Sequence, residues 1–329
     1  MIVTPSSVAF GFVCLIGLLI GLVLVVATVP RLWRARPGRT GLEDSLVLGL
    51  VLGQSLLASQ LLAWPLLYAT MVSYVPLTRG AMCVFGVTQK APWIVHSLEV
   101  LQPTALVMIG ALVALLGVRR AGQITVSGRL VVGHVVACAL ISTATSTLGL
   151  AYLMGPKDTQ PVSCCGAIFA SPDRFSAVAT GLFLGSKAST LILPVAVWLS
   201  ALLAWVVVWI ELSKPGTVRE VVAALLAVFL SGASVLSLFE TVAPTLLDRP
   251  THHCAYCLLN PRNSPLWLSL PALICLWLAT AIPVWRAWLA IAAPDSGAFR
   301  SRGWTVLVVL SLLAFWSIVL VPYSAHPVR

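Results

Sequence analysis

Residues 8–29 read VAFGFVCLIGLLIGLVLVVATV, an apolar run without a single charged side chain. A helix needs about 20 apolar residues to cross the hydrocarbon core of a bilayer, so this run predicts a membrane span. The residues before it, 1–7, carry no positive charge, and no small-residue cleavage site follows it. We therefore interpret the run as a retained span and not as a cleaved signal peptide.

Seven further runs along the chain have the length and apolar character of the first one. The eight expected spans are 8–29, 46–72, 94–118, 129–153, 177–211, 219–243, 266–289 and 304–322. Only helices and closed barrels satisfy their backbone polar groups in lipid, and runs of this length favour helices. The expected fold is an all-α integral membrane bundle. Because the segments between spans are short, we expect one polytopic domain covering residues 1–329.

The composition points to lipid as the main solvent of this protein. Of its 329 residues, 59% are hydrophobic and only 9% are charged, whereas a soluble domain carries about 25% charged residues. The formal net charge is +10, which fits cytoplasmic loops facing anionic headgroups. No stripe of basic and aromatic residues lies outside those loops, so we expect the bilayer and not nucleic acid as the partner.

The basic residues divide unequally between the two sets of loops. Twelve of them follow spans one, three, five and seven, and six lie in the other loops. The twelve are Arg31, Arg34, Arg36, Arg39, Arg119, Arg120, Arg129, Lys214, Arg219, Arg286, Arg300 and Arg302. The positive-inside rule places these loops in the cytoplasm and both termini on the non-cytoplasmic side. Glu211, at the cytoplasmic end of span five, is then expected at a solvated position.

The eight cysteines divide by location. Cys14, Cys138 and Cys275 fall within spans, where a thiol usually packs as a small apolar group. The other five lie in the three loops predicted to be extracytoplasmic. They are Cys83, Cys164, Cys165, Cys254 and Cys257. No loop predicted to be cytoplasmic contains a cysteine, and disulfides form outside the cytoplasm. The segregation predicts a functional role for the five thiols on that face.

Cys254 and Cys257 form a C-x-x-C motif, and His253 stands directly before it. A disulfide within such a motif closes a very small loop and contributes little stability, whereas neighbouring thiols exchange disulfides readily. A nearby imidazolium also favours the thiolate. The pattern predicts thiol–disulfide redox chemistry, with Cys254 and Cys257 as the exchanging pair, Cys164 and Cys165 as a second pair, and Cys83 as a resolving or gating thiol.

Two other interpretations fit the same residues. In the first, Cys83, His253, Cys254 and Cys257 are ligands of a soft metal, copper or zinc, that the protein binds or transports. In the second, disulfides only staple the outer loops of a subunit of a larger membrane complex. The redox interpretation requires a membrane quinone or a secreted thiol protein to take electrons, and the metal interpretation requires a metallochaperone. Compact loops without glycosylation sequons favour a bacterial inner membrane.

Charged residues near the outer ends of spans are further candidates, because intramembrane charge is costly and marks function. His96 and Glu99 are three residues apart and are expected to share one helix face, which Gln102 extends. Lys187 and Glu240 lie toward the same predicted leaflet. These four ionisable residues are expected to form a proton-relay pocket below the cysteines. Gln54 and Gln60 in span two are expected to make interhelical hydrogen bonds.

Overall fold

The computed structural model describes residues 3–34, 41–120, 128–155, 186–213, 216–247, 255–259, 266–292 and 302–325. These residues form helices and turns, with no strand among them. The long helices are α1 (Pro5–Arg34), α2 (Gly41–Tyr74), α4 (Pro92–Arg120), α5 (Gly128–Met154), α6 (Ser186–Leu212), α7 (Thr217–Ser237), α9 (Leu266–Ala292) and α10 (Arg302–Ala325). The short elements are η1 (Val75–Leu77), α3 (Val84–Thr88), η4 (Leu238–Val242), α8 (Ala243–Leu246) and η5 (Ala255–Leu259).

Eight helices in the described part of the chain are long and apolar enough to cross a membrane. The prediction of an all-helical, multi-pass bundle is therefore confirmed. Span five was expected to begin at residue 177, but α6 begins at Ser186, and residues 177–185 lie outside the described residues. The side on which each terminus lies stays a prediction.

Apolar side chains on the outside of the helices identify lipid as the solvent. On α1, Phe12, Leu19 and Val26 are 64%, 60% and 75% exposed and repeat every seven residues along one face. Water would leave such a stripe unfavourably hydrated over the whole length of a helix. Its exposure is compatible with the acyl chains of a bilayer, in which apolar surface carries no such penalty.

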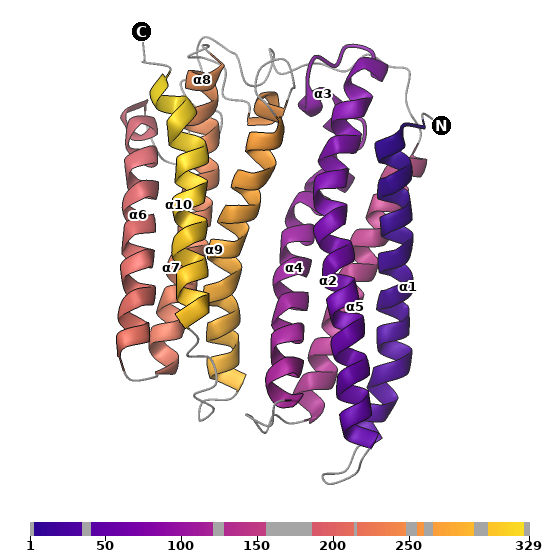
Figure 1. Cartoon of the computed structure of the whole chain (residues 1–329). Coiled ribbons are helices and arrows are strands. Elements are labelled where there is room, and N and C mark those ends of the chain that lie inside the picture. Colours follow the sequence, from indigo (N-terminus) through magenta and orange to yellow (C-terminus); the bar gives the residue numbers. More distant parts are fainter. Residues whose placement is uncertain are drawn as a thin grey trace. The chain divides into compact units, whose positions relative to one another are not determined.

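The chain divides into two compact units, each built from four long helices (Figure 1). Unit 1 consists of Met1–Ser73, Ala91–Asp158 and Trp288–Phe299, and unit 2 consists of Tyr74–Lys90, Thr159–Ala287 and Arg300–Arg329. Unit 1 holds α1, α2, α4 and α5. Unit 2 holds α6, α7, most of α9, and α10, together with the short elements. The expectation of a single polytopic domain stays a prediction.

Within unit 1, hydrogen bonds join α2 to α5 near the middle of both spans. Gln60 Nε2 donates to Ser142 Oγ at 3.0 Å, and Thr145 Oγ1 donates to Gln60 Oε1 at 3.3 Å. All three side chains are buried. The prediction for Gln60 is therefore confirmed, whereas Gln54 lies on the exposed face of α2. A buried amide in lipid is stable only with such partners.

Helices α1 and α5 of unit 1 pack closely because glycines face the neighbouring helix. A Cβ atom built on Gly17 would lie 2.9 Å from Ser146 Oγ, and one built on Gly149 would lie 2.7 Å from Cys14 Sγ. Both distances are below any ordinary contact, so the two backbones approach only where a side chain is missing. Small residues at helix interfaces are the usual means by which membrane helices pack against each other.

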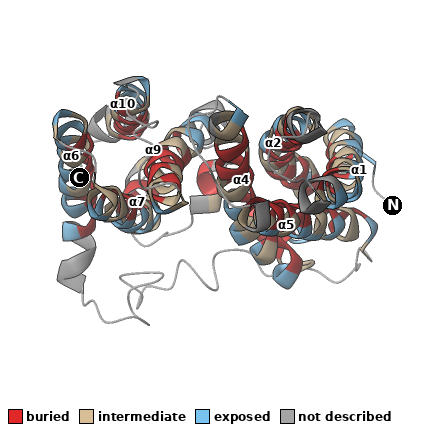
Figure 2. Ribbon diagram, turned by 90° about the horizontal axis from the view of Figure 1, so that it is seen from below, coloured by how far each residue is buried: buried red, intermediate tan, exposed pale blue. Residues whose placement is uncertain are grey.

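Within unit 2, each of the four long helices carries buried residues along part of its surface, coloured red on the ribbon of Figure 2. One apolar cluster contains Leu203, Ala227, Ile282 and Leu312, which come from α6, α7, α9 and α10 respectively. A second cluster contains Ala196 of α6, Leu276 of α9 and Phe315 of α10, and Phe315 is fully buried. Dispersion contacts among these side chains hold the four helices together, since lipid supplies no hydrophobic driving force between helices.

We predict that Gly149→Ala destabilises unit 1, because the new methyl group would overlap Cys14 and lie 3.0 Å from Phe10 Cζ. Overpacking of a filled core costs about 1–3 kcal/mol. The measurement is the thermal unfolding midpoint of the protein in detergent. Gly133→Ala, also on α5, is the matched control, since nothing lies within 4 Å of a Cβ there. Equal midpoints for the two variants would contradict the close α1–α5 packing.

Candidate functional site

A short helix places the first predicted thiol. The chain leaves η1 through a turn in which Gly80 has a φ of 83°, a conformation that glycine adopts without strain. Cys83 then precedes α3 with an extended backbone, and its carbonyl accepts a 3.0 Å hydrogen bond from the Gly86 N–H. All five residues of α3 are buried. The position of Cys83 is therefore set by a packed element.

A change of helix type precedes the second predicted thiol. After α7, residues Leu238–Val242 form a π-helical turn, which accommodates one more residue per hydrogen-bonded ring than an α-helix. Such turns occur frequently at functional sites. Helix α8 follows, and Cys257 lies within the 3₁₀-helix η5.

Cys83 and Cys257 meet in one buried cluster of unit 2. The cluster also contains Phe85, with Leu247 and Tyr256 packed against it. Cys83 is 2% exposed and Cys257 is 7% exposed, and the structure records both as thiols. Two cysteines that are far apart in the sequence and belong to different predicted loops are thus brought together.

Aromatic rings pack in and beside the cluster that contains the two thiols. The ring centroids of Phe85 and Tyr256 are 6.0 Å apart, and those of Phe239 and Tyr256 are 6.3 Å apart in an edge-to-face arrangement. These separations are typical of favourable aromatic pairs. The rings come from α3, from the π-helical turn and from η5, so the pairs connect all three elements.

The remaining predicted residues of the thiol site cannot be placed. Cys164, Cys165, His253 and Cys254 lie outside the described residues. In the described part of the chain, no group of three or more His, Cys, Asp or Glu side chains is arranged to hold a metal ion. The metal interpretation needs His253 and Cys254, so it stays a prediction, as does their role in redox chemistry.

His96 and Glu99 share one face of α4, as expected. His96 Nδ1 and Glu99 Oε2 are 3.0 Å apart, with side-chain exposures of 52% and 18%. Gln102, the next polar residue on this face, is 1% exposed, and its Oε1 has no hydrogen-bond partner in the described part of the chain. All three belong to unit 1, whereas Cys83 and Cys257 belong to unit 2. Their convergence on one pocket stays a prediction.

Glu240 and Lys187 both belong to unit 2. Glu240 lies in the π-helical turn directly after Phe239 and is 4% exposed. Lys187 lies in the first turn of α6, but its side chain is not among the described ones. The expected proton-relay role of these residues therefore stays a prediction. In the structure Glu240 is buried, and it directly follows Phe239, whose ring contacts Tyr256.

The structure corrects the interpretation of two residues. Arg286 was counted among solvated loop cations, but it lies within α9 and is 3% exposed. Glu211, expected at a solvated position, forms an ion pair with Arg286 at 3.6 Å. The Arg286 side chain is 4% exposed and the Glu211 side chain 12%. The positive-inside rule counts a basic residue by its position near the end of a span. That count does not detect an acidic side chain that pairs with it inside the bundle.

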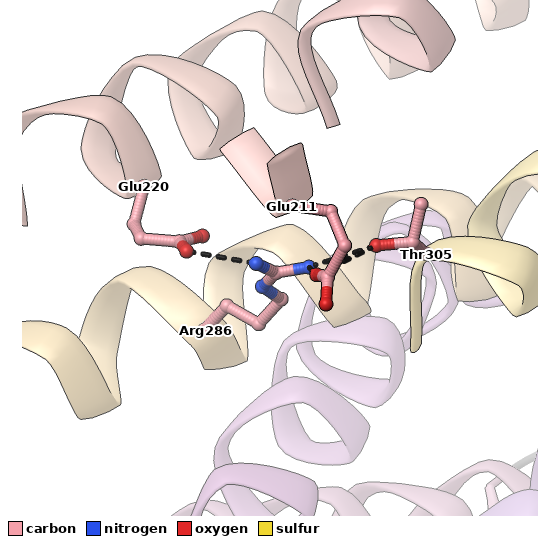
Figure 3. Close-up of polar contacts among 4 residues, drawn as sticks. All are labelled: Glu211, Glu220, Arg286 and Thr305. Atoms are coloured by element: carbon pink, nitrogen blue, oxygen red, sulfur yellow. Dashed lines mark hydrogen bonds and ion pairs between the residues drawn. The ribbon is translucent and has the colours of Figure 1, made fainter. Parts of the chain in front are cut away.

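The ion pair is part of a network that joins all four long helices of unit 2 (Figure 3). Arg286 Nη2 donates to Glu220 Oε1 at 2.8 Å, and Nη1 donates to Thr305 Oγ1 at 3.2 Å. Thr305 Oγ1 in turn donates to Glu211 Oε2 at 3.2 Å. The guanidinium presents several donors in one plane, which suits two carboxylates from different helices. The network lies at the opposite end of α7 from the π-helical turn.

We predict that Arg286→Met strongly destabilises unit 2, because the partly buried carboxylates of Glu211 and Glu220 would lose their cation. Breaking a buried ion pair in this way costs about 3–5 kcal/mol. The measurement is the unfolding midpoint in detergent. The triple variant Glu211→Gln, Glu220→Gln, Arg286→Met removes all three charges and should recover most of the loss.

Arg219→Met serves as the control for that prediction. Arg219 lies at the same end of α7, only partly buried, with its guanidinium 4.6 Å from the centroid of the Trp209 ring. Its replacement should lower the midpoint much less than Arg286→Met does. If Arg286→Met proved as stable as the wild-type protein, the network would have no structural role.

Comparison with known proteins adds no assignment to these observations. No protein-family model matches the chain, and no curated protein or solved structure matches it either. No activity, substrate or partner is therefore transferred from a relative. The chemistry of the residues themselves has to carry the inference of function.

Proposed function

We propose that this multi-pass membrane protein carries out thiol–disulfide exchange at its extracytoplasmic face. The observation that carries the proposal is the burial of Cys83 and Cys257 in one cluster of unit 2. Cys257 is the second cysteine of the C-x-x-C motif, so one thiol of an exchange-competent motif lies in the same cluster as a thiol from another loop. A resolving thiol has to be this close to the exchanging pair.

The proposed reaction oxidises a substrate dithiol to a disulfide and passes the two electrons to a membrane quinone. A thiolate of the substrate attacks the Cys254–Cys257 disulfide, and a mixed disulfide forms as the other sulfur leaves with an electron pair and takes up a proton. The second substrate thiolate then displaces the enzyme sulfur, so that the substrate leaves as a disulfide and the enzyme holds two thiols. A membrane quinone, which takes two electrons and two protons, regenerates the disulfide.

Within this scheme, Cys83 acts on Cys257. In the oxidised protein a Cys83–Cys257 disulfide forms by exchange and leaves Cys254 as a thiol, and Cys164 and Cys165 serve as a second exchanging pair. His253 favours the thiolate of Cys254. The two protons that the thiols release on oxidation pass through Glu240 to the quinone, with Lys187, His96 and Glu99 as further members of the relay.

The C-x-x-C motif supports chemistry more than a structural role for these thiols. A staple gains most when it closes a long loop of the unfolded chain, and a Cys83–Cys257 bridge would do that. The third thiol, Cys254, which comes three residues before Cys257 in the sequence, is unnecessary for such a staple but required for exchange. Soft-metal binding is the second candidate, because two sulfur ligands in one cluster also suit copper or zinc.

We predict that Cys83 and Cys257 change redox state together. The full-length protein in detergent is equilibrated with glutathione redox buffers and quenched with an alkylating reagent, and the modified peptides are identified by mass spectrometry. Cys257→Ser should abolish reversible oxidation of both Cys83 and Cys254, whereas Cys83→Ser should leave the Cys254–Cys257 disulfide as the one that forms among these three thiols. Oxidation of the Cys164–Cys165 pair should persist in both variants. Cys275→Ser, a half-buried thiol of α9 in the same unit, is the control and should change nothing.

Two results would overturn the proposal. A disulfide that no buffer reduces without unfolding the protein would indicate a structural staple. Stoichiometric copper or zinc in the purified protein, lost on Cys83→Ser or Cys257→Ser but retained in Cys275→Ser, would indicate the metal alternative.

A further inference from the structure

We propose that the aromatic contacts of Tyr256 with Phe85 and Phe239 position the thiol pair and thereby set its reduction potential. The inference rests on the proposed function, and it assigns to three residues a role that the thiol chemistry by itself does not require. Tyr256 is the central ring, since both other rings contact it.

Phe85 and Tyr256 are each within two residues of one of the two cysteines along the chain. Phe85 follows Cys83 by two residues at the start of α3, and Tyr256 directly precedes Cys257 in η5. The backbone from Cys83 to Phe85 and the backbone from Tyr256 to Cys257 each belong to, or directly precede, a short helix, so both have little freedom. The 6.0 Å separation of the ring centroids therefore restricts how far Cys83 and Cys257 can move apart.

Phe239 anchors Tyr256 from the other side. Its ring is 6.3 Å from that of Tyr256 and nearly perpendicular to it, at 78°. Phe239 occupies the π-helical turn, where the additional residue rotates the following side chains relative to the α-helix. The same turn carries Glu240, so the anchor of the ring and the buried carboxylate are consecutive residues.

Disulfide stability depends strongly on how well the two cysteines are held. The bond requires a narrow range of Cα and Cβ separations and of torsion angle, and departures make it easier to reduce. A pair held in place has a high effective concentration of one thiol at the other. Loss of the rings lowers that concentration, so the disulfide becomes less stable and its reduction potential becomes less negative.

The experiment measures the Cys83–Cys257 equilibrium in the full-length protein. Cys254→Ser serves as the parent, so that Cys257 has Cys83 as its partner, and the fraction of disulfide is measured by alkylation across glutathione buffers. Tyr256→Ala and Phe85→Ala should each reduce the equilibrium constant for disulfide formation at least tenfold, which corresponds to about 30 mV. Tyr256→Phe retains the ring and should stay within twofold of the parent.

Two further variants keep the test decisive. Phe239→Leu retains apolar volume but removes the edge-to-face contact, and it should give a smaller shift in the same direction even if the alanine variants unfold. Trp205→Ala removes a ring of the exposed Trp205–Trp209 stack on α6, whose centroids are 6.1 Å apart, and should leave the equilibrium unchanged.

The outcomes separate the two proposals. If the parent forms no Cys83–Cys257 disulfide in any buffer, the proposed function fails. If the parent forms it and Tyr256→Ala and Phe239→Leu match the parent, only the positioning role is overturned. A shift in Tyr256→Phe as large as that in Tyr256→Ala would also overturn it, because the ring would then not be the feature that matters.

Discussion

Polar groups in hydrocarbon have no water to bond with, and this constraint organises the whole structure. It makes every long segment helical, because only a helix satisfies its own backbone within one span. The same constraint explains the polar side chains inside each unit. Gln60 bonds to Ser142 and Thr145 across two helices, and the Arg286 guanidinium is neutralised by Glu211 and Glu220. Gln102 is an exception, because its buried Oε1 has no hydrogen-bond partner in the described part of the chain.

The two ends of unit 2 use different interactions for different purposes. At one end, two carboxylates and a hydroxyl from three helices converge on Arg286 of a fourth, and loss of that cation is costly because the guanidinium is buried. At the other end, thiols and rings from short irregular elements converge, with little charge among the described residues of the cluster. The first arrangement suits a permanent junction of helices. The second suits a site whose covalent bonding changes while the surrounding helices stay in place.

The spans could be predicted from the sequence because the bilayer imposes a length and a composition on each of them. The His96–Glu99 contact could also be predicted, since residues three apart on a helix are neighbours. The Arg286 network could not, because the positive-inside rule treats an arginine near a span end as a loop residue. The sequence does contain a signal for this network. Arg286 lies within an apolar run, and Glu211 and Glu220 stand on either side of the short loop between spans five and six.

The candidate site was predictable in residue type but not in geometry. Segregation of cysteines among alternate loops singled out Cys83 and Cys257, but no sequence rule states which loops pack together. The π-helical turn at Glu240 has one more residue per hydrogen-bonded ring than an α-helix and leaves no compositional signal. The rings of Phe85 and Tyr256 looked like ordinary apolar residues beside cysteines. Only the packing of α3 against η5 reveals that they face each other.

The most direct test of the account is whether Cys83 and Cys257 together bind one trivalent arsenical. Phenylarsine oxide forms a stable product only when two thiols reach the same arsenic atom. The test uses the full-length chain with every other cysteine replaced by serine, under reducing conditions and in detergent. The account predicts one arsenical bound per chain, with both thiols protected from alkylation and both released by a competing dithiol. Independent alkylation of the two thiols at saturating arsenical would contradict it.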